Sequence, residues 1–117
     1  MNKREVGSLN EDRAARFLTA HGYEIIQKNF YCRMGEIDII ARSEGYLCFV
    51  EVKYRSSEAS GSPGEAITPR KIRRITRTAQ YYMLINNIPE NTPCRFDVII
   101  ILDDKITLIP NAFDGIL

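Results

Sequence analysis

Two apolar stretches separated by a glycine-containing turn constrain this chain more than any other feature. Residues 35–42 and 46–53 are rich in Ile, Val, Phe and Tyr, which favour β-strands. A turn at residues 44–45 joins them as an antiparallel hairpin, with Ser43 opposite Tyr46. The sequence therefore predicts a hairpin whose register can be counted outward from this turn.

That register gathers four charged side chains on one face. Asp38 falls opposite Glu51, and Glu36 falls opposite Lys53. The other face is apolar and consists of Ile37, Ile39, Val50 and Val52. Two carboxylates directly opposite each other repel, and a divalent cation between them turns the repulsion into coordination. The alternative is an exposed face whose charges are solvated or paired, for instance Glu36 with Lys53.

Lys53 follows the second carboxylate by two residues and therefore points the same way. Its ammonium group can hold an attacking water molecule or stabilise charge that grows on a phosphate oxygen. On the residues alone, a metal site and a solvated strand face both stay open.

Composition limits the function classes that remain. At 117 residues the chain has the size of one domain, here 1–117, and its formal net charge is only +1. A single histidine, His21, argues against most histidine-dependent mechanisms, including a Ser-His-Asp triad and a multi-histidine metal site. The three cysteines contain no CxxC pair, which argues against a disulfide framework and structural zinc. Any catalysis must use carboxylates, lysine or a metal.

No apolar run is long enough to span a bilayer, and the charged N-terminus leads into no apolar signal region. The sequence therefore predicts a cytoplasmic protein with no membrane partner.

The remaining pattern predicts an α/β domain in which helices pack on one mixed sheet. The expected order is helix, three strands, helix, two strands. Helices are expected at residues 3–21 and from 69 to about 87, and strands at 23–30, 35–42, 46–53, 94–102 and 105–109. Thr68 is expected to cap the second helix, and Pro110 to end the last strand. Residues 54–64, rich in Ser and Gly, indicate a loop.

The second helix carries an uninterrupted group of basic residues. Five lie between positions 70 and 77 without an acid among them: Arg70, Lys71, Arg73, Arg74 and Arg77. The forked donors of arginine suit phosphate, so we expect this side of the helix to bind a nucleic-acid backbone. The alternative is a solvated face that aids solubility.

Two further carboxylates lie among apolar residues. Glu11 shares a face of the first helix with Ala14 and Leu18, so it either points inward and needs a partner or reaches water at the margin. Asp97 lies in the apolar strand 94–102, where we expect it to cap the strand end or to bind a lysine or arginine.

Four blocks of this sequence, in order, resemble the YraN family. They are Gly35-Glu36-Ile37-Asp38-Ile39-Ile40-Ala41, Phe49-Val50-Glu51-Val52-Lys53, Arg95-Phe96-Asp97-Val98 and Asn111-Ala112-Phe113. The resemblance extends from about residue 7 to residue 113. Asp38 followed by Glu51-Val52-Lys53 also resembles the D…(D/E)xK motif of restriction-endonuclease-like nucleases. Members of the YraN family are small bacterial proteins usually described as endonuclease-like and related to archaeal Holliday-junction resolvases.

The resemblance implies a restriction-endonuclease-like core, with a central mixed five-stranded sheet flanked by helices. It implies metal-dependent hydrolysis of DNA, with branched DNA favoured. Asp38 and Glu51 are then expected to bind Mg²⁺ or Mn²⁺, helped by Glu11 and the backbone carbonyl of Val52, while Lys53 acts on the water or the transition state.

Two more positions follow from the same resemblance. Glu36 and Gln80 are expected near the metal, just outside its ligands, although Gln80 is equally consistent with a surface position on the second helix. Resolvase-like relatives often act as dimers, which implies a homodimer. A nucleic-acid-binding module without cleavage and a metal-stabilised structural protein stay open as alternatives.

Overall fold

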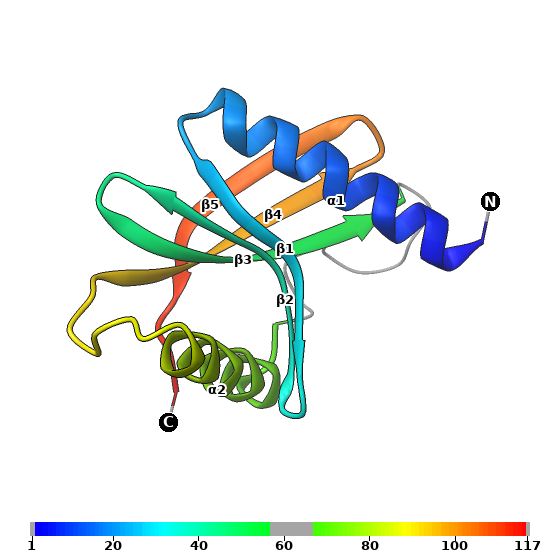
Figure 1. Ribbon diagram of the computed structural model, residues 1–117. Helices are drawn as coiled ribbons and strands as arrows, with labels where there is room; N and C mark the ends of the chain where they lie inside the picture. The colour runs from blue at the N-terminus through cyan, green and yellow to red at the C-terminus, as the bar shows by residue number, and fades with distance from the viewer. Residues whose placement is uncertain (1, 57–66, 117) are drawn as a thin grey trace.

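The computed structural model describes residues 2–56 and 67–116. Its elements follow the predicted order and are α1 (Lys3–Ala20), β1 (Glu24–Cys32), β2 (Gly35–Ser43), β3 (Tyr46–Arg55), α2 (Pro69–Ile85), β4 (Cys94–Leu102) and β5 (Lys105–Phe113). The strands form one sheet in the order β1-β2-β3-β4-β5, in which β3 and β4 are parallel and the other neighbours antiparallel. The two helices lie on opposite sides of this sheet (Figure 1). The predicted α/β fold is confirmed.

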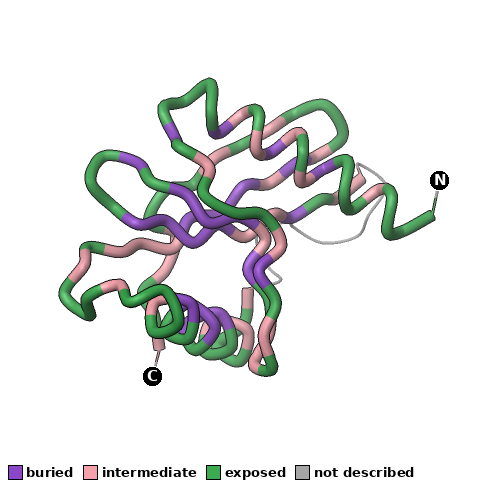
Figure 2. The backbone as a smooth tube through the Cα atoms, viewed as in Figure 1, coloured by how far each residue is buried: buried purple, intermediate pink, exposed green. Residues whose placement is uncertain are grey.

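Each face of the sheet buries its own apolar cluster against one helix. Ala14 and Leu18 of α1 pack on Ile39 and Val50, while Ile75 and Tyr82 of α2 pack on a second cluster that includes Phe49. The buried backbone runs through the central strands and along the inward sides of both helices (Figure 2). Burial on both faces explains why β3 and β4 are almost continuously apolar.

Both helices begin where the sequence places a capping residue. The Asn2 side chain accepts a hydrogen bond from the backbone N–H of Glu5 at 2.8 Å. The Thr68 hydroxyl accepts one from the N–H of Lys71 at 3.2 Å, and Pro69 occupies the first helical position. The predicted cap of α2 is therefore confirmed.

The pairing of β2 with β3 follows the predicted register only along part of its length. Ser43 pairs with Tyr46, as expected, but the ladder ends at Ile39 and Val50. Beyond this point the β1–β2 hairpin bends away from β3, and its tip lies beside α2 (Figure 1). The tip packs closely against α2, because a Cβ atom on Gly35 would lie 3.2 Å from the Thr78 hydroxyl oxygen.

This separation of the strands corrects two expectations. The expected pairing of Glu36 with Lys53 is wrong, because the ladder between β2 and β3 ends at Ile39 and Val50, and Glu36 pairs only with Tyr31 of β1 in the described residues. Ile37 does not share a face with Ile39: it packs in the α2 cluster, whereas Ile39 packs in the α1 cluster. The bend in β2 interrupts the simple alternation of faces between these two residues.

The strands β1 and β5 both continue beyond their predicted ends. β1 continues to Cys32, and β5 continues through Pro110 to Phe113. Pro110 is tolerated because β5 is an edge strand, where a missing N–H costs no ladder bond. The register shifts opposite this stretch, and the N–H of Asn111 bonds to the Asp97 carboxylate at 2.8 Å.

Asp97 has the structural role that the sequence predicts. It is fully buried, accepts a hydrogen bond from the Tyr23 hydroxyl at 2.7 Å, and is bonded to Arg95 at 3.1 Å. The guanidinium of Arg95 also donates to the Tyr23 oxygen at 2.9 Å. Charge and hydrogen-bonding capacity are thus satisfied inside the core.

Part of the expected loop at residues 54–64 is strand, because Tyr54 and Arg55 extend β3. Residues 57–64 of that loop lie outside the described residues. Neither helix in the described ranges combines the length and the apolarity that crossing a membrane requires.

Candidate functional site

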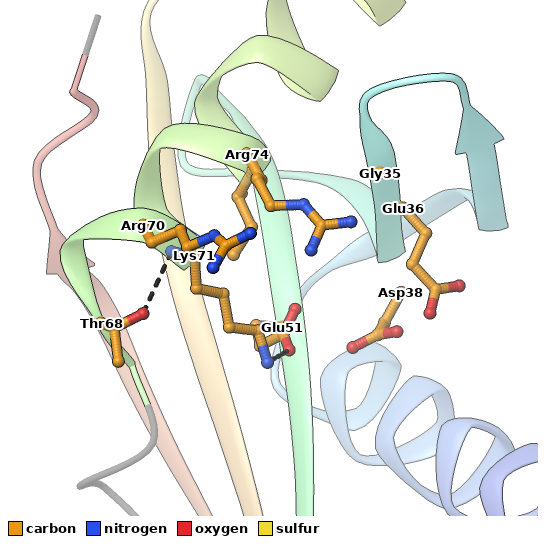
Figure 3. A pocket seen from close by; sticks show the side chains of 9 residues that line it. Gly35, Glu36, Asp38, Glu51, Thr68, Arg70, Lys71 and Arg74 are labelled. Carbon is orange, nitrogen blue, oxygen red and sulfur yellow. Dashed lines mark hydrogen bonds and ion pairs between the residues drawn. The ribbon is translucent and has the colours of Figure 1, made fainter.

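A pocket of about 570 Å³ opens where β2 leaves β3. One side is acidic and carries Glu36, Asp38 and Glu51, and the facing side is the first part of α2, which carries Arg70, Lys71 and Arg74. Figure 3 shows the carboxyl groups of Glu36 and Asp38 on the hairpin side and the basic side chains on the helix side. The pocket therefore brings together the two charged features that the sequence singles out.

Asp38 fills the position at which the sheet ladder stops. Its Oδ2 atom accepts a hydrogen bond from the backbone N–H of Val52 at 2.7 Å, which satisfies a donor that β2 no longer reaches. Burial and the neighbouring Glu51 carboxylate raise the pKa of Asp38 to about 8, and Glu11 and Glu36 add to this rise. A positive charge placed beside this carboxyl group would therefore favour its ionised form.

Glu51 is held by a lysine of α2. Its Oε1 atom lies 2.7 Å from the Lys71 Nζ atom, and the side chain of Glu51 is only 12% exposed, against 40% for Lys71. Figure 3 shows this ion pair within the pocket. Asp38 and Glu51 line one pocket, but their strands have parted, so they are not a laddered cross-strand pair.

Lys53 is unusually buried for a lysine, with 3% of its surface exposed. Burial lowers the pKa of its ammonium group, Lys71 lowers it further, and Glu51 opposes the change. Lys53 thus belongs to the charge network of Glu51 and Lys71, although it is not among the residues that line the pocket.

Glu11 reaches the same network from α1. Burial raises the pKa of Glu11, a hydrogen bond from Asn29 opposes this rise, and Glu36 raises it again. Its charge in turn raises the pKa of Asp38. Glu11 therefore points toward the acidic cluster, which matches the inward-pointing alternative expected from the sequence. It does not line the pocket itself.

The basic residues of α2 divide into two sets. Arg70, Lys71 and Arg74 line the pocket, whereas Arg73 and Arg77 are exposed elsewhere on the helix. The structure does not bring Gln80 to this site. Gln80 lines a separate hollow with Met83, Leu84, Ile88 and Glu90.

The donor set suits a hard divalent cation in its chemistry but is small. Within residues 2–56 and 67–116, no three His, Cys, Asp or Glu side chains are grouped closely enough to hold a metal ion together. Mg²⁺ commonly needs only one or two carboxylates, because water and substrate phosphates complete its coordination. Asp38 and Glu51 fit that smaller requirement.

Two residues near the site escape the sequence pattern. The Tyr31 side chain is 68% exposed, and its pKa is raised chiefly by the charge of Glu36, its partner across β1 and β2. Asn29, which bonds Glu11, has a positive φ of 56°. Sequence reasoning misses the pairing of Tyr31 with Glu36, because the first strand is predicted to end at residue 30. The left-handed conformation of Asn29 has no sequence signal beyond the residue type.

The comparisons with known proteins agree with one another. The family model described as "Uncharacterised protein family UPF0102" matches residues 10–101. A UPF0102 protein of Lachnoclostridium phytofermentans is 57% identical over 115 residues, which cover 98% of each chain.

Two further relatives carry the same description. The UPF0102 protein of Acetivibrio thermocellus is 47% identical over 122 residues, covering 96% of this chain and 93% of that protein. The one from Caldicellulosiruptor saccharolyticus is 44% identical over 119 residues, covering 97% and 100%. Similarity at this level extends over nearly the whole chain, including the acidic hairpin and α2.

Proposed function

This chain belongs to the UPF0102 family, which is the YraN family, and on that premise we propose that it is a metal-dependent endonuclease acting on DNA. The observation that carries the proposal is the pocket in which Asp38 and Glu51 face Arg70, Lys71 and Arg74. Carboxylates bind a divalent cation and basic side chains bind phosphate, so a pocket holding both suits a phosphodiester. The relationship of the family to junction resolvases favours branched DNA.

Asp38 and Glu51 are the residues that would hold Mg²⁺ or Mn²⁺, with Glu11 and the Val52 carbonyl as further proposed contributors. Burial and the charge of Glu51 favour the protonated form of Asp38. A bound cation would supply the positive charge that stabilises the ionised carboxylate. Glu36 lines the same pocket and is proposed to act from outside the ligands. A bound cation supplies Lewis acidity, which acidifies water and offsets charge on the scissile phosphate.

The cationic side chains take separate roles in this proposal. Lys53, buried beside Glu51, holds the attacking water or stabilises charge on a phosphate oxygen. Arg70 and Arg74 hold the DNA backbone from α2, and Arg73 and Arg77 extend that contact along the exposed helix. Backbone contacts position a substrate without reading its sequence, which fits selection by DNA structure.

A nucleic-acid-binding module without cleavage is the second candidate function. The ion pair between Glu51 and Lys71 favours it, because it engages one of the two proposed metal ligands. The arginines of α2 serve this candidate equally well. Asp38 separates the two functions, since a half-buried carboxyl group beside Glu51 gives a pure binder of phosphate no advantage. A metal-stabilised structural protein, the third reading, has no use for the basic side of the pocket.

Oligomeric state and location extend the same proposal. Cutting both strands of a symmetric junction needs two sites, so we propose a homodimer on the DNA. Light scattering with and without a four-way junction tests this. A cytoplasmic location remains a prediction of the sequence.

The decisive experiment compares labelled four-way junction, linear duplex and single strands in Mg²⁺ and in Mn²⁺. Asp38→Asn and Lys53→Ala are the matched controls, and EDTA is the blank. Cleavage by the native protein that both variants lose supports the endonuclease and identifies its preferred substrate. Binding without cleavage in either metal rejects it in favour of the binding module.

A further inference from the structure

Lys71 is the one basic residue of the pocket that already holds a carboxylate. Its Nζ atom lies 2.7 Å from Glu51. Arg70 and Arg74 line the same pocket and are exposed, and neither forms an ion pair with a carboxylate of the described residues. Lys71 therefore differs from its neighbours on α2 in what it binds, although all three line the pocket.

The lysine supplies the positive charge that Glu51 needs while it is largely shielded from water. A divalent cation on Glu51 supplies the same charge, and the two cations repel each other at this distance. Lys71 can leave, because its side chain is 40% exposed and its ammonium group ends a flexible stem.

From these contacts we infer that Lys71 is a positioning residue that exchanges Glu51 for a substrate phosphate. When a cation occupies Glu51, the freed ammonium group joins Arg70 and Arg74 on the phosphate side of the pocket. A divalent cation and a phosphodiester then bind cooperatively. The cation on Glu51 frees Lys71 for the phosphate, and a phosphate bound to Lys71 frees Glu51 for the cation. This inference rests on the proposed function and adds a coupling between its two ligands.

Binding of Mn²⁺ to the full chain, without DNA, tests the first half. Free Mn²⁺ is measured by electron paramagnetic resonance for the native protein, Lys71→Met, Lys71→Arg and Arg74→Met. Arg74→Met is the matched control, because it removes one positive charge from the same pocket without releasing a carboxylate. Lys71→Met should bind Mn²⁺ roughly fivefold more tightly than Arg74→Met, and Lys71→Arg should resemble the native protein.

Affinity for a labelled oligonucleotide, with Ca²⁺ and with EDTA, tests the second half. The gain in affinity on adding Ca²⁺ should be large in the native protein and in Arg74→Met, and reduced in Lys71→Met. Equal Mn²⁺ affinities in Lys71→Met and Arg74→Met, or equal gains with Ca²⁺, overturn the exchange while leaving the metal site intact. Absence of Mn²⁺ binding in every variant overturns the proposed metal site together with the exchange.

Discussion

Asp38 accepts a hydrogen bond from the backbone N–H of Val52 across the gap between β2 and β3. A side chain thus replaces a strand as the partner of that N–H. This contact places the half-buried carboxyl group beside Glu51 and explains how two acids come to share a pocket without being paired in the sheet.

Removing this acceptor should destabilise the protein more than replacing the carboxyl group with an amide. Asp38→Ala leaves the Val52 N–H without its side-chain partner, whereas Asp38→Asn keeps an oxygen there. We expect Asp38→Ala to be less stable than Asp38→Asn by about 1–2 kcal/mol. Urea denaturation of both variants in EDTA measures the difference, and equal midpoints with equal slopes would contradict it.

Asp38 should also make the stability of the metal-free protein depend on pH. Burial and Glu51 raise the pKa of Asp38 to about 8 in the folded state, from an ordinary value of 3.8. Between these values the folded state holds a proton that the unfolded state has released, so the free energy of unfolding falls as pH rises. Asp38→Asn carries no such proton. Denaturation in EDTA from about pH 5 to about pH 8 should show a flatter profile for this variant.

The close packing of the hairpin tip against α2 predicts that substitution of Gly35 strongly destabilises the protein. Its φ is 152°, and a Cβ atom would lie 3.2 Å from the Thr78 hydroxyl oxygen, so Gly35→Ala should lower the melting temperature and disturb the pocket. Gly7→Ala is the control, because Gly7 lies inside α1 with nothing near its Cβ position. That change should be neutral or stabilising by up to about 1 kcal/mol. Similar losses in both variants would refute the close contact.

The polar cluster of Tyr23, Arg95 and Asp97 should contribute to stability alone. Tyr23→Phe removes a hydroxyl that donates to Asp97 and accepts from Arg95, so we expect a loss of about 1.5–3 kcal/mol. Tyr46→Phe, at a tyrosine that is 41% exposed, is the control. Chemical denaturation measures both. Mn²⁺ affinity of folded Tyr23→Phe should stay at the native value, and a change there would tie this cluster to the pocket.

The two sets of arginines on α2 should differ in their contribution to DNA binding. Arg74 lines the pocket and Arg77 does not, although both are exposed. Arg74→Gln should reduce the slope of log affinity against log salt concentration by about one, while Arg77→Gln should reduce it less. Fluorescence anisotropy with labelled duplex across a salt series measures the slopes. An equal reduction would assign the contact to the whole helix.

Local sequence patterns predicted much of the fold, because turns, helix caps and strands depend mainly on residues that are close together in the sequence. The turn at Ser43 and Tyr46, the cap at Thr68 and the bond between Asp97 and Arg95 all follow from short-range sequence. The separation of β2 from β3 does not, because it depends on where the hairpin tip meets α2, which lies far along the chain.

The candidate site was predictable to the same degree. Counting outward from the turn brings Asp38 near Glu51, and helical spacing brings Arg70 near Arg74. The ion pair of Lys71 with Glu51 joins two elements whose relative placement is a tertiary property. The exposure of Tyr31 and the distance of Gln80 from the pocket have the same origin.

The division of the pocket into an acidic and a basic side affects how a ligand approaches it. Three carboxyl groups face three cations, so when all are ionised their charges cancel at long range and leave an electric dipole across the opening. Such a dipole orients an arriving charged molecule more than it raises the local concentration of that molecule at the pocket. If the proposed function holds, this dipole is expected to select the direction from which a phosphodiester enters.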